Sequence, residues 1–194
     1  MRLKLITAPT IQPVTKAEAK AHLRIDTTTE DDFIDTLIKA ATNFAEEYTY
    51  RQFITATYEQ YMDDFPDGST AIKLEKPKLQ SITSITYIDT AGATQTWTST
   101  LYEADIKSDI GKVRPVSGES YPSTDDIYNA VTIKFKAGYG DAAANVPDLL
   151  KSTLKVMVSH LFENREFVTP QGQQLIFPEA ILLLLDQFSL REFI

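Results

Sequence analysis

The chain has 194 residues, of which 43% are hydrophobic and 24% are charged, and its formal net charge at pH 7 is −8. A chain of this length buries roughly 70% of its unfolded surface, so it can form a hydrophobic core without covalent cross-links. It contains no cysteine, which excludes disulfides, thiol catalysis and cysteine-bound zinc or iron–sulfur centres. The acidic balance also argues against a free-standing nucleic-acid reader, because such proteins present a basic surface to phosphates.

The N-terminal part, residues 1–52, is predicted to be mainly helical after an extended start. Thr15 and Glu18 stand three residues apart and form a capping box, which predicts a helix over about 16–24. An apolar stripe at helical spacing predicts a second helix over about 30–50. We expect a threonine just before this second helix, at position 28 or 29, to cap it.

Four carboxylates gather where the second helix begins. Acidic side chains suit this position because they stabilise the positive end of the helix dipole. The simplest interpretation is a solvated helix start, and the functional one is an electronegative patch on the protein surface. The residues of this candidate acidic patch are Glu30, Asp31, Asp32 and Asp35.

Residues 53–140 are predicted to form a β-rich insertion. Six of the seven glycines lie between residues 68 and 140, where they separate short tracts rich in β-branched and aromatic residues. The clearest strand, 131–137, alternates apolar and polar residues, which predicts one buried and one solvated face. The other candidate strands are 54–62, 72–74, 82–88, 95–98 and 102–106.

Residues 141–194 are predicted to form a C-terminal helical part and tail that pack with residues 1–52 as one body. Apolar spacing predicts helices over about 147–165 and 178–188, and each begins near a proline. The fold class expected from the whole pattern is therefore α+β, a small helical bundle with a β-rich insertion. The apolar run 181–185 is far shorter than the roughly 20 residues that cross a bilayer, so we expect no membrane partner.

The residues that could carry chemistry do not form a recognisable site. His22 and His160 are far apart, and neither has a second histidine at metal-binding spacing. Residues 138–140 lack the spacing and the lysine of a phosphate loop, and we interpret them as a turn. Residues 63–68 begin like a calcium loop, but Phe65 occupies a ligand position. We expect no catalytic residue, cofactor or metal; a small hydrolase would need one histidine to face a carboxylate across a cleft.

Several stretches, taken together, resemble one known family. They read P-V-T-K-A-E-A-K-A-H-L-R at residues 13–24, A-G-Y-G-D at 137–141, V-P at 146–147 and H-L-F-E-N-R-E at 160–166. Their order and spacing are similar to those of tailed-phage head–tail connector proteins, which also occur in prophages and gene transfer agents. The resemblance extends over most of the chain, and the departures lie in the β region and the final tail.

This resemblance implies a structural adaptor rather than an enzyme. Proteins of this family assemble, commonly as rings of twelve copies, beneath the portal at the head–tail interface of the virion, after assembly in the host cytoplasm. The ring joins the portal to a stopper or another neck or tail protein, and DNA passes through its centre. An acidic wall would suit such a channel because it does not hold DNA, so the candidate acidic patch is also a candidate lumen surface.

The end of the chain is the candidate portal-docking segment. Its apolar residues would be unusual on the exposed tail of a monomer, and we expect them to bind a groove on the portal. The candidate docking residues are Arg191, Phe193 and Ile194. The alternative function left open by the sequence is a DNA-packaging or nucleic-acid-binding accessory protein.

Overall fold

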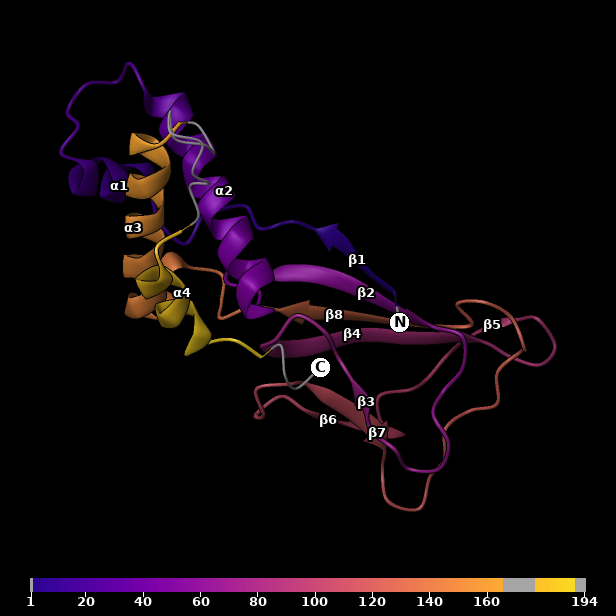
Figure 1. Ribbon diagram of the computed structural model, residues 1–194. Coiled ribbons are helices and arrows are strands. Elements are labelled where there is room, and N and C mark those ends of the chain that lie inside the picture. Colours follow the sequence, from indigo (N-terminus) through magenta and orange to yellow (C-terminus); the bar gives the residue numbers. More distant parts are fainter. Residues whose placement is uncertain (1, 166–176, 191–194) are drawn as a thin grey trace, which may run out of the picture. The chain divides into compact units, whose positions relative to one another are not determined.

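The computed structural model describes residues 2–165 and 177–190, and these divide into two compact units (Figure 1). The helical unit contains residues 10–54 together with the described residues from 141 onward. The β unit contains residues 2–9 and 55–140. The chain therefore begins in the β unit, crosses to the helical unit, returns for the long β segment and crosses back.

The helical unit is built from α1 (Lys16–Leu23), α2 (Asp31–Thr49), α3 (Asp148–Glu163) and α4 (Glu179–Asp186), with a short 3₁₀ turn at Ala143–Asn145. Helices α1, α2 and α3 contact one another, and α4 packs on α2 and α3. These elements confirm the four expected helices, α1 from its capping box and the other three from apolar spacing. None of the helices in the described ranges is long and apolar enough to cross a membrane.

The core of the helical unit is formed by apolar stripes on α2, α3 and α4. On α2 the buried stripe includes Leu37 and Ala41 of the predicted one, whereas Phe44, which the predicted stripe also contained, is 39% exposed. Burying a large aliphatic side chain contributes about 1.5–3 kcal/mol, so these stripes supply the main stabilisation of the unit. The buried apolar side chains of α2, α3 and α4 are Ile34, Leu37, Ile38, Ala41, Ala45, Leu150, Leu154, Met157, Val158, Ile181 and Leu185.

The start of α1 confirms the capping box. The main-chain N–H of Glu18 donates to Thr15 Oγ1 at 3.2 Å, and the main-chain N–H of Thr15 donates to Glu18 Oε2 at 2.8 Å. The expected threonine cap of α2 is wrong. The N-cap of α2 is Glu30, which makes no side-chain capping bond, and the N–H of Asp31 donates instead to the main-chain carbonyl of Thr28 at 3.2 Å. The chain enters α2 through this turn, which leaves no threonine at the capping position.

The β unit consists of two antiparallel sheets. The five-stranded sheet has the order β1-β2-β8-β4-β5, with bounds β1 Arg2–Thr7, β2 Ala56–Met62, β8 Val131–Ala137, β4 Leu79–Ile88 and β5 Thr94–Thr96. The three-stranded sheet has the order β3-β7-β6, with bounds β3 Ile72–Lys73, β7 Lys112–Pro115 and β6 Tyr102–Asp105. The sequence did not predict β7, and it indicated only an extended segment for β1.

One face of the five-stranded sheet forms the core of the β unit. Strands β2 and β8 pair from Ala56 with Ala137 to Met62 with Val131, so their alternate residues lie on the same face. The core-facing residues of β8 are fully buried, whereas those between them are half-buried or exposed, as the alternation predicted. Aromatic side chains from β4, the short strand β6 and the loops complete this core: Tyr87, Tyr102, Phe65, Trp97 and Tyr121.

Candidate interaction surfaces

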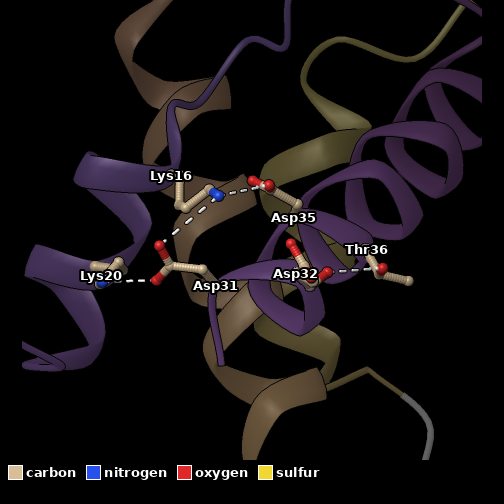
Figure 2. Close-up of polar contacts among 6 residues, drawn as sticks. All are labelled: Lys16, Lys20, Asp31, Asp32, Asp35 and Thr36. Carbon is tan, nitrogen blue, oxygen red and sulfur yellow. Dashed lines mark hydrogen bonds and ion pairs between the residues drawn. The ribbon is translucent and has the colours of Figure 1, made fainter. Parts of the chain in front are cut away.

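The candidate acidic patch is an ion-pair cluster that joins α1 to α2. Lys20 Nζ lies 2.6 Å from Asp31 Oδ1, and Lys16 Nζ lies 2.8 Å from Asp35 Oδ2 and 3.8 Å from Asp31 Oδ2. Figure 2 shows both lysines reaching from α1 toward the first turns of α2. The lysines stand four residues apart in α1, so both lie on the face of that helix that meets α2.

The pKa values of this cluster shift as the ion pairs require. The hydrogen bond from Lys20 holds the pKa of Asp31 below its ordinary value, and the hydrogen bond to Asp35 raises the pKa of Lys16. Each shift favours the charged form of the group. The cluster is therefore a set of mutually neutralising charges at neutral pH.

A third cation reaches the patch from the end of α3. Arg165 Nη2 lies 2.5 Å from Glu30 Oε1, and its guanidinium carbon lies 4.7 Å from the ring centre of Phe33 and 5.6 Å from that of Phe162. A guanidinium can hold a carboxylate and an aromatic face at once because it is planar and weakly hydrated. This contact ties the first turn of α2 to the last turn of α3.

Asp32 differs from the other three acidic residues. It is exposed, and its carboxylate has no ion pair within the described ranges; its main-chain carbonyl accepts the hydroxyl of Thr36 at 2.9 Å (Figure 2). Three of the four predicted patch residues therefore form an ion pair, whereas Asp32 only adds to the electrostatic field that raises the pKa of Lys16. A role of this patch as a lumen surface stays a prediction.

The other residues singled out in the sequence are separate from this cluster. His22 is exposed on α1, whereas His160 is half-buried on α3 with its ring centre 5.5 Å from that of Phe177. Within residues 2–165 and 177–190, no group of three or more histidines and carboxylates could hold a metal ion. The candidate docking residues Arg191, Phe193 and Ile194 lie outside the described residues.

A hollow of about 430 Å³ lies at one end of the five-stranded sheet. Arg2 of β1 and Tyr61 of β2 line one part of it, and Asp63, Asp64 and Tyr128 line the rest together with their neighbours. The carboxylates are already engaged in the turn, because Asp63 accepts the main-chain N–H of Asn129 at 2.7 Å and Asp64 accepts that of Phe65 at 2.7 Å. These bonds hold the loops that follow β2 and precede β8.

The face of the five-stranded sheet opposite the core is polar and was not recognised in the sequence. We call it the outer face. The strand register places residues of neighbouring strands opposite one another, so the side chains of this face form three rows that run across the strands. The first row is Arg2, Tyr61, Thr132, Thr86 and Thr96; the second is Lys4, Glu59, Lys134 and Ser84; the third is Thr7, Thr57, Lys136 and Ser81. The polar positions of 131–137 were visible as an alternation, but the register with β1 and β2 is needed to show that basic residues share this face.

The fold is α+β, with a helical unit and a two-sheet β unit. Three solved structures share it over almost their whole length. A chain in the neck of an empty gene transfer agent particle, computed with C6 symmetry, matches with a TM-score of 0.79 at 18% identity, covering 97% of this chain and 95% of that one. Chains in the native gene transfer agent virion and in its neck computed with C12 symmetry match with TM-scores of 0.79 and 0.76 at 20% and 17% identity, with the same coverage.

A family model places part of the chain more specifically. Residues 15–93 match the phage gp6-like head–tail connector protein family. This match confirms the resemblance to tailed-phage head–tail connectors, on a segment that extends from the capping box of α1 to the turn before β5. No curated protein sequence matches the chain.

Proposed function

We propose that this protein is a structural head–tail connector of a tailed phage, a prophage or a gene transfer agent. Copies of it, twelve in each ring, assemble below the portal and join it to a stopper or another neck or tail protein. Genomic DNA passes through the centre of the ring. The protein is then part of the virion, and it acts by surface fit rather than by converting a substrate.

The observation that carries this proposal is the combination of a family match with a shared fold. The connector family model covers residues 15–93, and the fold is that of chains in particles whose necks were computed with C6 and C12 symmetry. The symmetry named for those necks supports a ring, because repeated head-to-tail contacts close into a ring when the rotation per copy divides a full turn.

The helical unit is our candidate for the contacts between copies. Helix α3 exposes two apolar side chains on one face, Leu149 at 39% and Val156 at 43%, and α4 exposes Leu183 at 58%. Leu149 and Val156 stand seven residues apart and so lie on one stripe of the helix. Apolar stripes left open in a single copy are the kind of surface that a neighbouring copy covers.

The decisive experiment is electron microscopy of the purified protein mixed with its portal. We expect added annular density at one end of the portal and none on the portal alone. If the protein does not bind the portal at concentrations at which other neck proteins saturate the portal, the connector proposal is wrong. The competing alternative is a small hydrolase, whose candidate bases are His22 and His160. In a connector neither histidine has a catalytic role, so we expect the variant with both replaced by alanine to assemble unchanged.

A further inference from the structure

The outer face of the five-stranded sheet concentrates positive charge in an acidic protein. Its rows contain four cations, Arg2, Lys4, Lys134 and Lys136, against one carboxylate, Glu59. The formal charge of this face is thus +3, in a chain whose formal net charge is −8. Charge is therefore distributed unevenly over the protein, and this positive region lies on the five-stranded sheet.

Three of the four cations on this face are available to a ligand. Arg2, Lys4 and Lys136 are exposed, and none of them has an ion pair within the part of the chain that the structure describes, although the charge of Lys4 helps to lower the pKa of Glu59. Lys134 is engaged, because its Nζ lies 3.4 Å from Glu59 Oε1. Glu59 also accepts the hydroxyl of Tyr61 at 2.6 Å, and this hydrogen bond is the main cause of its lowered pKa.

The spacing of the cations suits a charged polymer. Lys4 on β1 and Lys134 on β8 are separated by β2, so two strand spacings, about 10 Å, lie between them. The three rows extend over about 13 Å along the strands. Duplex DNA carries one negative charge per roughly 1.7 Å of its axis, so a patch of this size meets several phosphates at once.

The remaining side chains of the outer face are hydroxyls. Serine, threonine and tyrosine hydroxyls donate to phosphate oxygens alongside lysine and arginine. Apart from the ring of Tyr61, the rows contain no aromatic or aliphatic anchor, which is what a protein–protein contact uses for most of its binding energy. The chemistry of the face therefore favours a phosphate backbone over an acidic protein. The hydroxyl-bearing residues are Tyr61, Thr132, Thr86, Thr96, Ser84, Thr7, Thr57 and Ser81.

We propose that the outer face of the five-stranded sheet binds the phosphate backbone of duplex DNA, without base specificity. The acidic remainder of the chain weakens this contact, so that DNA is touched by one face and not held by the whole protein. The choice of duplex DNA rests on the proposed connector function, in which DNA passes the protein. The charge and register of the face do not depend on that function.

The test is binding of the full chain to a short labelled duplex of arbitrary sequence, followed by fluorescence anisotropy at several salt concentrations. For three phosphate contacts we expect a log–log slope of about −2.7, which is a loss of about 40-fold in affinity between 50 and 200 mM salt. Replacing the three available cations, Arg2→Gln, Lys4→Gln and Lys136→Gln together, should bring the slope close to zero and weaken binding at the lower salt by about tenfold or more.

A matched variant controls for net charge. Lys39→Gln, Lys107→Gln and Lys112→Gln together remove the same number of charges from exposed positions off this face. This control should keep the slope of the unmodified protein. Equal weakening of both triple variants would show a general charge effect and would overturn the proposal.

A variant that binds the duplex more tightly provides a second test, because misfolding would not increase the affinity for DNA. Glu59→Gln removes the carboxylate and releases Lys134 from its ion pair, so we expect affinity for the duplex to rise by about fivefold. No change in this variant would contradict the assigned face. Loss of binding to a neck protein in the outer-face triple variant, with DNA binding intact, would identify a protein-docking surface instead and would also overturn the proposal.

The experiment separates this inference from the connector function. Portal binding of the same outer-face variant is measured by microscopy in parallel. If the unmodified protein forms rings on the portal but shows no salt-dependent DNA binding, the inference fails and the connector function stands. If it binds DNA through this face and forms no ring, the face is correctly assigned and the connector function fails.

Discussion

The side chain of Gln60 holds β3 against the five-stranded sheet by hydrogen bonding to the main chain of Lys73. Its Nε2 donates to the carbonyl of Lys73 at 2.9 Å, and its Oε1 accepts the main-chain N–H of Glu75 at 3.0 Å. Gln60 is fully buried in β2, on the face that forms the core. Because a buried amide is stable only when its polar atoms are paired, this residue fixes the position of β3 beside β2.

We expect Gln60→Leu to destabilise the protein by about 2–4 kcal/mol. The substitution leaves the carbonyl of Lys73 and the N–H of Glu75 without their partner in a part-buried position, and each unpaired group costs about 1–3 kcal/mol. Denaturant unfolding followed by circular dichroism measures the loss. Thr57→Ala, on the outer face of the same strand, is the control and should change stability by no more than about 0.5 kcal/mol. A loss this small for Gln60→Leu would contradict the assigned role.

The ion pairs of the α1–α2 cluster predict an acid-dependent part of the stability. The pKa of Asp31 is lowered in the folded protein, chiefly by the hydrogen bond from Lys20. A lowered folded pKa contributes stability that is present above the unfolded value, near 3.8, and is lost as the pH falls through the folded value. We therefore expect Asp31→Asn to flatten the dependence of the unfolding free energy on pH below about 4.

Asp32→Asn is the matched control for this prediction. It removes a carboxylate of the same type from the neighbouring position, where no ion pair holds the charge among the described residues. Its unfolding free energy should follow the pH profile of the unmodified protein. Identical flattening in the two variants would mean that the general charge of the helix start, and not the contact with Lys20, sets the acid sensitivity.

These residues also show where sequence reasoning succeeds and where it stops. The capping box of Thr15 and Glu18 lies within three residues, so local spacing is enough to predict it and the helix that follows. The acidic residues of α2 read as a solvated helix start, because their partners come from elsewhere in the chain. Lys20 is 11 residues from Asp31, and Arg165 is 135 residues from Glu30.

The strands show the same limit. β8 was predicted because its seven residues alternate clearly, whereas β7 was missed because it has only four residues and ends at Pro115. The charge of the outer face could not be predicted either. It depends on pairing Lys4 with Glu59 and Glu59 with Lys134, and a shift of one residue in either register would turn these side chains to the other face.

The exposed apolar stripe of α3 predicts that substitutions there impair assembly of the ring without changing the stability of the fold. Leu149→Lys combined with Val156→Lys should change the free energy of unfolding by no more than about 0.5 kcal/mol, because both side chains are already exposed. The same variant should lose ring density on the portal, since charges replace the apolar contact with the next copy. Leu101→Lys, at a side chain that is 38% exposed in the β unit, is the control and should assemble normally. Normal rings from the α3 variant would exclude this helix face from the contacts between copies.

The last prediction concerns the end of the chain. Leu190 is buried, and its main-chain N–H donates to the carbonyl of Thr49 at 3.1 Å, so the helical unit keeps this anchor when the chain stops after residue 190. Removing residues 191–194 takes away the candidate docking residues Arg191, Phe193 and Ile194. We expect the shortened protein to unfold at the same denaturant concentration as the full chain and to bind the portal at least about tenfold more weakly, which corresponds to about 1.4 kcal/mol. Portal affinity is measured by surface-immobilised binding, with Arg191→Ala as a single-residue comparison. Unchanged affinity after the truncation would assign portal docking to another part of the protein.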